Sequence, residues 1–255
     1  MSHPVSISVV IITYNEQNNI RRCLESVKDI ADEIIVVDSF STDDTRKICL
    51  EYGVRFYEHR FEGYAQQKNW GNALAAYSYI LSIDADEELS TELRESIRAV
   101  KNDCTADGYS FNRMNNYCGR WIRHSGWYPD KKIRLWNKYK GEWKGAGPHE
   151  RLVMDPEATV IHLKGDLLHY TATSVHDHFS TLNRYAWMQA NNDYMNGVRS
   201  DIFKRHLYPF LKFFHLYLLR QGFLDGFYGY VIAKTSAIAT RLRYLYLHDL
   251  HKRKV

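Results

Sequence analysis

The sequence predicts an α/β fold: a mostly parallel, Rossmann-like sheet flanked by helices, followed by a helical appendage at the C-terminal end. In the first half, short β-branched runs alternate with segments of helical periodicity, which is the pattern of βαβ units. From about residue 175 onward only helical periodicity remains. No low-complexity linker or repeat separates these parts. We therefore expect one domain over residues 1–174, with halves at 1–90 and 91–174, and a helical region over 175–255.

Composition narrows the class of protein. The 255 residues are 45% hydrophobic and 25% charged, which excludes disordered, collagen-like and coiled-coil proteins. The four cysteines form no CxxC spacing, so we expect reduced thiols, as in a cytosol. The start of the chain lacks the basic segment and cleavage site of a signal peptide. No apolar run reaches the roughly 18 residues of a membrane-spanning helix, so we expect a cytoplasmic chain that does not cross a bilayer.

The first βαβ unit is predicted over residues 9–37. Val9–Ile12 is a continuous β-branched run, which is typical of a strand buried on both faces. Over residues 20–27, apolar residues recur at positions i, i+3, i+4 and i+7, which indicates a helix with one apolar stripe. Ile34–Val37 is predicted as the second strand.

The pattern then repeats. Ser41–Asp44 has the Ser-x-x-Asp form of a capping box and predicts a helix that ends before Gly53. We expect the next elements to be a strand over 54–57, a helix over 64–76, a strand over 79–83 and a helix from Ser90.

Beyond Asp107 the pattern changes to short strands rich in Trp, Tyr, Arg and Gly, with His162 and His169 flanking a hairpin. The helical region from Val175 is expected to break softly at Pro209 and at glycines 222, 226 and 229.

Charge is concentrated at the C-terminal end. The net charge is +4, but residues 201–255 hold ten Lys and Arg against three Asp, and they include 12 of the 36 aromatic residues. Helical packing with a solvated face and contact with anionic lipid both explain this pattern. Nucleic-acid binding is disfavoured, because no RNA- or DNA-binding motif accompanies the charge. We expect residues 201–255 to form helices that lie on an anionic membrane without crossing it.

Carboxylates follow two of the predicted strands. Asp38 ends the second strand, where it could bind a ribose or a base, or only form the turn. Asp84 and Asp86 form an Asp-x-Asp motif that suits Mg²⁺ or Mn²⁺ and a diphosphate, although carboxylates also favour a helix start. We assign that helix-start role to Glu87 and Glu88.

Two further side chains have two interpretations each. Glu150 lies in a Gly-rich stretch and could take a proton from an attacking hydroxyl, or it could be an ordinary loop residue beside Arg151. Lys68 lies on a predicted helix, where an exposed lysine is the default.

The ordered motifs resemble the family-2 glycosyltransferases of GT-A fold. The matching blocks are Val9–Glu16, Glu33–Thr45, Gln66–Asn69 and Ile83–Glu87. Three later segments, Trp127–Asp130, Lys132–Trp136 and Gly147–Glu150, resemble the bacterial lipopolysaccharide-core β-glucosyltransferases that add glucose to inner-core heptose.

This resemblance implies a role for each site residue. Those expected around the uridine are Thr13, Asn15, Glu16 and Asp38. Lys68 would lie near the nucleotide, Asp84 would face the ribose or donor sugar, and Asp86 would bind the metal. His169 would help to hold the metal. Glu150 stands in a His-Glu pair where the family commonly has Glu-Asp, and we expect it to be the catalytic base. Trp127 or Trp143 could offer a flat face to a sugar.

The resemblance also implies a reaction. We expect an inverting transfer of a hexose such as glucose from a UDP-sugar to a hydroxyl of a cell-envelope glycan or glycolipid, with residues 1–90 binding nucleotide and 91–174 binding acceptor. The expected partners are thus a nucleotide sugar, that acceptor and the inner face of the cytoplasmic membrane, but no nucleic acid.

Two alternative functions are a nucleotidyltransferase and a non-catalytic nucleotide-sugar-binding module. The first is disfavoured because Tyr14-Asn-Glu16 replaces the Gly-rich, basic loop it would need, and the second because Asp84, Asp86 and Glu150 are retained.

Overall fold

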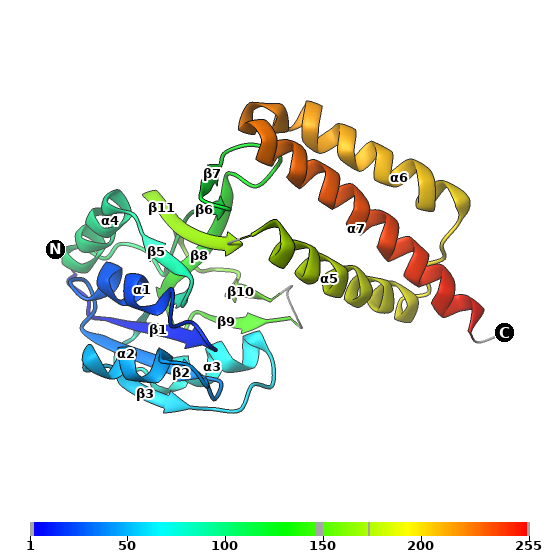
Figure 1. The fold of residues 1–255 in the computed structure, drawn as a ribbon. Helices are drawn as coiled ribbons and strands as arrows, with labels where there is room; N and C mark the ends of the chain where they lie inside the picture. Colours follow the sequence, from blue (N-terminus) through cyan, green and yellow to red (C-terminus); the bar gives the residue numbers. More distant parts are fainter. Residues whose placement is uncertain (1–2, 146–149, 173, 254–255) are drawn as a thin grey trace. The chain divides into compact units, whose positions relative to one another are not determined.

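The structure, a computed structural model, describes residues 3–145, 150–172 and 174–253 (Figure 1). The chain forms two compact units. Unit 1 comprises Met1–Arg113 and Asp130–His169, and unit 2 comprises Met114–Pro129 and Tyr170–Val255. Residues 114–129, which the sequence placed in the acceptor-binding half, therefore group with the C-terminal helices. The Gly147–His149 part of the predicted motif lies outside the described residues.

The main sheet has the strand order β3-β2-β1-β4-β8-β6-β11-β5, with β7 paired to β6. Its first four strands are parallel, and the pairs of β8 with β4 and β6, and of β5 with β11, are antiparallel. The strands are β1 (Ile7–Thr13), β2 (Glu33–Asp38), β3 (Arg55–Glu58), β4 (Tyr79–Asp84), β5 (Glu87–Leu89), β6 (Gly108–Tyr117), β7 (Arg120–Ile122), β8 (Asp130–Asn137) and β11 (Val160–Ala172). A separate antiparallel pair is formed by β9 (Gly141–Lys144) and β10 (Arg151–Met154).

Helices cover both faces of the parallel strands in unit 1. They are α1 (Ile20–Val27), α2 (Thr45–Glu51), α3 (Tyr64–Leu74) and α4 (Thr91–Asn102). Alternate residues of β1 enter different cores: Val9 and Ile11 pack in the cluster that contains α1 and α4, whereas Val10 packs in the cluster that contains α3. This two-sided burial explains why β1 reads as an unbroken β-branched run, and it confirms the predicted α/β class.

The elements predicted in the first 90 residues are present, but the sequence missed strand β5, where Glu87 and Glu88 lie in place of a helix start, and one capping signal needs correction. The four apolar positions of the first helix are all buried. The capping box is wrong, however: α2 begins at Thr45, its N-cap Asp44 makes no side-chain cap bond, and Ser41 bonds to Asp38 instead. The Ser41 hydroxyl donates to Asp38 and its oxygen accepts the Asn15 amide, so it does not accept from the amides at the start of α2.

Two later expectations also need correction. His162 and His169 do not flank a hairpin, because both lie on the single strand β11. Pro209 does not break the chain either. It lies inside α6 (Ile202–Phe214), and the helical path changes after it, in the π-helical turn His215–Leu219 and the 3₁₀ turn Gly222–Asp225. Gly229 does not break the path either, because it lies inside α7 (Gly226–Lys252).

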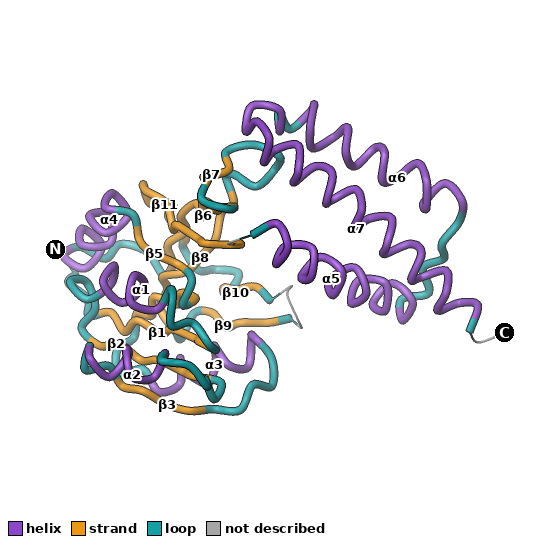
Figure 2. Tube along the Cα trace, in the orientation of Figure 1, coloured by secondary structure: helices purple, strands orange, loops and turns teal. Residues whose placement is uncertain are grey.

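Unit 2 is built around three long helices (Figure 2), α5 (Val175–Met195), α6 and α7 (Gly226–Lys252). A two-pronged ion pair joins α7 to α5, with Arg243 Nε and Nη2 at 2.6 and 2.7 Å from the Asp193 carboxylate. A Cβ at Gly229 would lie 1.8 Å from the Gly222 carbonyl oxygen, so α7 can approach the turn only with glycine there.

Within the described residues, no helix is both long and apolar enough to cross a membrane.

Candidate active site

The carboxyl ends of three parallel strands meet at one edge of the sheet. Thr13 of β1 pairs in register with Asp38 of β2, and its neighbour Ile12 pairs with Asp84 of β4. Open parallel sheets bind ligands at this edge, where the strand order allows loops to diverge. The fold thus brings together candidate residues that are up to 71 positions apart in sequence.

The loops after β1 and β2 are joined by hydrogen bonds. The Asn15 amide donates to Ser41 Oγ (2.8 Å), and Asn15 Oδ1 accepts from the Thr42 amide (2.8 Å). Asn15 adopts a left-handed conformation (φ 54°), which asparagine tolerates better than most residues. Thr13 Oγ1 lies buried beneath these loops and has no hydrogen-bond partner among the described residues.

Asp38 forms the turn after its strand. The buried carboxylate accepts from the Ser41 amide (2.7 Å) and from Ser41 Oγ (2.5 Å). The turn-forming alternative is therefore present in the structure, and a contact with uridine stays a prediction.

Lys68 is buried, contrary to the default of an exposed helical lysine. Its side chain is 1% exposed, and its Nζ lies 3.0 Å from Asp84 Oδ1 and 3.3 Å from Glu150 Oε1. The ammonium also lies 4.4 Å from the ring centroid of Trp143. Gly71, one turn further along α3, allows the helix to press on β1 and β2, since a Cβ there would clash with Val10. Lys68 thus joins the predicted donor-side carboxylate to the predicted base.

A second buried cation, Arg134 of β8, was missed by the sequence analysis. Its Nη2 lies 3.2 Å from Asp84 Oδ2 and 3.0 Å from Glu87 Oε1. Glu87 is fully buried, and its Oε2 accepts the Asp84 amide (2.9 Å). The assignment of Glu87 to a helix start is therefore wrong: it holds the Asp-x-Asp turn from behind. The available signal was a charged residue inside the otherwise apolar Ile133–Trp136 run.

Neighbouring charges keep Asp84 ionised. Burial raises the pKa of its carboxyl, but the charges of Lys68 and Arg134 outweigh burial and hold that pKa well below its usual range. Asp84 is consequently a poor proton acceptor and remains a fixed negative charge in the site.

At Glu16, the effects that raise the pKa outweigh the effect that lowers it. Burial raises the pKa of its carboxyl, and the hydrogen bond from Asn19 Nδ2 (2.7 Å) only partly opposes this. The charges of Asp86 and Asp84 raise it further. Glu16 therefore lies near two other carboxylates at this edge of the sheet.

Asp86 and His169 form the predicted metal pair. Asp86 Oδ2 lies 3.2 Å from His169 Nε2, and the hydrogen bond to Asp86 raises the pKa of His169, although burial lowers it. Among the described residues, no cluster of three or more His, Cys, Asp or Glu side chains is arranged to hold a metal. Mg²⁺ is commonly bound through one or two carboxylates plus substrate phosphates, so this donor set fits a cation completed by a diphosphate.

The two tryptophans proposed as sugar platforms are both packed in the fold. Trp143 is 6% exposed, with Lys68 and Arg134 against its ring, so it has no free face. Trp127 belongs to unit 2, where it packs edge-on to Tyr117 at 5.7 Å.

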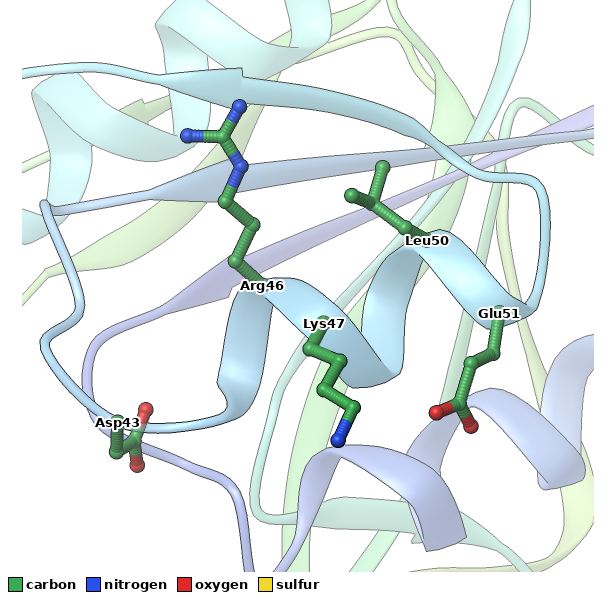
Figure 3. Close-up of a pocket in the computed structure, with 5 residues that line it drawn as sticks. All are labelled: Asp43, Arg46, Lys47, Leu50 and Glu51. Carbon is green, nitrogen blue, oxygen red and sulfur yellow. The ribbon is translucent and has the colours of Figure 1, made fainter.

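A shallow pocket beside α2 is lined by Asp43, Arg46, Lys47, Leu50 and Glu51 (Figure 3). Arg46 and Leu50 lie on one side of the helix and Lys47 and Glu51 on the other, so the side chains do not converge on one ligand. Arg46 is already paired with Glu58 and Glu51 with Arg21. We assign no function to this pocket.

Comparison with known proteins identifies the family of this chain. Residues 8–155 match the model of glycosyl transferase family 2. The chain is 32% identical to an uncharacterized glycosyltransferase of Rickettsia typhi, over 96% of this chain and 87% of that protein. It is 28% identical to the lipopolysaccharide core biosynthesis glycosyltransferase LpsC of Rhizobium meliloti, over 97% and 94%. A solved structure of S. aureus TarS 1-349 in complex with UDP-GlcNAc is similar at 17% identity and TM-score 0.48, covering 98% of this chain and 92% of that one. The family match and the full-length relatives agree: the chain belongs to glycosyl transferase family 2, and it is a glycosyltransferase.

Proposed function

We propose that this glycosyltransferase moves a hexose from a UDP-sugar to a hydroxyl group with inversion at the anomeric carbon. The observation that carries the proposal is the Lys68 bridge, in which one buried ammonium contacts both Asp84 and Glu150. The bridge supports the proposal because it links a strand-end carboxylate, which we assign to the donor side, to the carboxylate that we assign as the base. A binding module would need no such link between the two groups.

The donor would bind at the carboxyl edge of the parallel strands. The joined loops after β1 and β2 present Thr13, Asn15, Glu16 and Asp38 there, and we assign the uridine to these residues. The unpartnered Thr13 Oγ1 supports this assignment, because a buried hydroxyl without a partner carries a free-energy cost that a ligand can remove. Lys68 and Asp84 would then lie beside the ribose or donor sugar.

A divalent cation, Mg²⁺ or Mn²⁺, would be held by Asp86 and His169. When bound, it supplies Lewis-acid stabilisation of the negative charge on departing UDP. The protein's part is to orient the carboxylate and the imidazole, which already lie in contact.

Glu150 would act as the base. Lys68 orients its Oε1 at 3.3 Å, while Oε2 has no hydrogen-bond partner within the described part of the chain. In the transfer step, the acceptor oxygen forms a bond to the anomeric carbon as the bond from that carbon to the diphosphate oxygen breaks. The acceptor proton passes to Glu150, and UDP leaves with the electron pair. The transition state is expected to resemble an oxocarbenium ion, by analogy with glycosidases.

The acceptor would be a cell-envelope glycan or glycolipid, with the lipopolysaccharide inner core as the specific candidate. The support is a 28% identical relative, similar over nearly the whole chain, that is named for lipopolysaccharide core biosynthesis. Glycolipid acceptors place the enzyme at the cytoplasmic face of the inner membrane, peripherally bound. Glucose is the proposed sugar.

The test is a panel of UDP-sugars, each incubated with Mn²⁺ or Mg²⁺ and with purified inner-core glycolipid. We expect UDP release to depend on the acceptor and to be greatest with UDP-glucose, and we expect a new β-linked hexose on the product by NMR. Release that is equal with and without every acceptor would contradict transfer to this class. An α-linked product would contradict inversion.

A further inference from the structure

Helix α6 carries an apolar stripe that faces solvent. Phe203, Leu207, Phe210 and Phe214 recur at positions i, i+4, i+7 and i+11, so they lie along one side of the helix. They are 67, 44, 64 and 43% exposed. The opposite side of α6 buries Pro209. The stripe therefore is an outer face of unit 2 and is not the face that holds the helix in place.

Two more exposed apolar side chains lie beyond the end of the helix. Leu219 is 66% exposed and Phe227 is 70% exposed, at the two ends of the connection between α6 and α7. Soluble monomers rarely expose contiguous apolar patches larger than a few hundred Å², and larger ones mark interaction sites. Aromatic side chains at this density cost solubility unless they are covered at some stage of function.

The C-terminal segment that carries the stripe is positively charged. Residues 201–255 carry ten basic and three acidic side chains. All three acidic residues are engaged within unit 2: Asp201 caps α6, Asp225 holds the backbone of His124, and Asp249 pairs with Arg253. In the described part of the chain, Lys212 and Lys234 make no ion pair and are exposed. The partner must therefore accept both apolar side chains and uncompensated positive charge.

We propose that the stripe on α6 docks onto an anionic lipid surface, with the helix lying in the plane of the interface. Such helices bury one apolar face to the level of the headgroups while Lys and Arg contact anionic lipids. A second copy of the chain is a weaker occupant, because the same face on both copies would bring positive charge against positive charge. This inference deepens the proposed peripheral location and rests on that proposal, but it does not depend on which sugar is transferred.

The test is sedimentation of the full chain with vesicles of phosphatidylglycerol and phosphatidylethanolamine, or with neutral phosphatidylcholine vesicles. We expect binding to the anionic vesicles only. Phe203→Asp and Phe210→Asp should each weaken it about tenfold, since each removes one buried aromatic contact. Leu245→Asp is the matched control: it adds the same charge at an exposed position of α7 and should change binding by less than about threefold.

Three readouts separate the possible outcomes. Melting curves identify a variant that fails to fold, and in that case Phe210→Ser, which adds no charge, replaces it.

Analytical ultracentrifugation tests the other occupant, a second copy of the chain. If the stripe variants convert a dimer to a monomer while vesicle binding is unchanged, the proposal is overturned. UDP release without vesicles tests the proposed function separately, because a chain that binds vesicles through α6 but turns over no UDP-sugar refutes only the enzymatic proposal. Equal sedimentation of wild type and both stripe variants also overturns the docking.

Discussion

Units 1 and 2 depart from the usual distribution of side chains in opposite directions. Unit 1 buries Lys68, Glu87 and Arg134, whereas unit 2 exposes Phe203 and Phe210. Buried charges are costly unless they are paired, and exposed apolar stripes are costly in water. Neither buried charges nor an exposed apolar stripe makes a fold more stable than an apolar core and a polar surface would. Departures of this kind are expected at functional sites, and the two proposals above are built on them.

The comparison also separates two kinds of recognition. The charges of unit 1 are fixed by several contacts each, so they can hold a small polar ligand in one orientation. The stripe of unit 2 offers no directional contacts, which suits a fluid surface. Substitutions that remove one charge from unit 1 and substitutions that remove one aromatic side chain from the stripe should therefore affect different measurements.

The largest effect on stability is expected from Arg134→Met. This change leaves the fully buried Glu87 without its nearest cation, and breaking a buried pair costs about 3–5 kcal/mol of unfolding free energy. Arg46→Met is the control, because Arg46 and Glu58 form an exposed pair worth about 0–1 kcal/mol. Urea unfolding of both variants gives the comparison. Equal losses of unfolding free energy in the two variants would mean that the buried Arg134–Glu87 pair contributes no more to stability than an exposed pair.

Removal of the divalent cation should slow transfer strongly but leave unit 1 folded. Lewis-acid stabilisation of a leaving diphosphate is worth several kcal/mol, so excess EDTA should slow UDP release by roughly 10²–10³-fold. Asp86→Asn, which keeps the size of the side chain but removes its charge, should lower turnover with an unchanged melting temperature. Normal turnover in EDTA would remove the metal from the proposed function.

The smallest effect on stability is expected from Phe210→Ser on the α6 stripe. Because the side chain is mostly solvent-exposed, its loss should change the free energy of unfolding by no more than about 0.5 kcal/mol. Leu247→Ala, at a fully buried position of α7, should cost about 2–5 kcal/mol. Chemical denaturation of both variants checks this contrast. A large loss from Phe210→Ser would show that the stripe is part of the core of unit 2.

The sequence predicted the elements of the first 90 residues well, because β-branched runs and helical spacing are local signals. It also proposed Asp84, Asp86 and Glu150 as site residues, and their roles stay predictions. It did not predict the burial of Lys68, since its two carboxylate partners lie 16 and 82 positions away along the chain. Helical spacing alone likewise could not tell that the α6 stripe faces outward, because a periodic apolar face is usually buried.

The measurement that tests the account most directly is the rate of sugar transfer by Glu150→Gln under saturating donor. The amide keeps the shape of the side chain but cannot take the acceptor proton, so transfer should slow by roughly 10²–10⁴-fold while UDP affinity stays unchanged. Glu157→Gln, which neutralises an exposed carboxylate seven positions away, should transfer at the wild-type rate. Near-normal transfer by Glu150→Gln would contradict the account and assign the base to another carboxylate, with Asp130 and Asp155 as the next candidates.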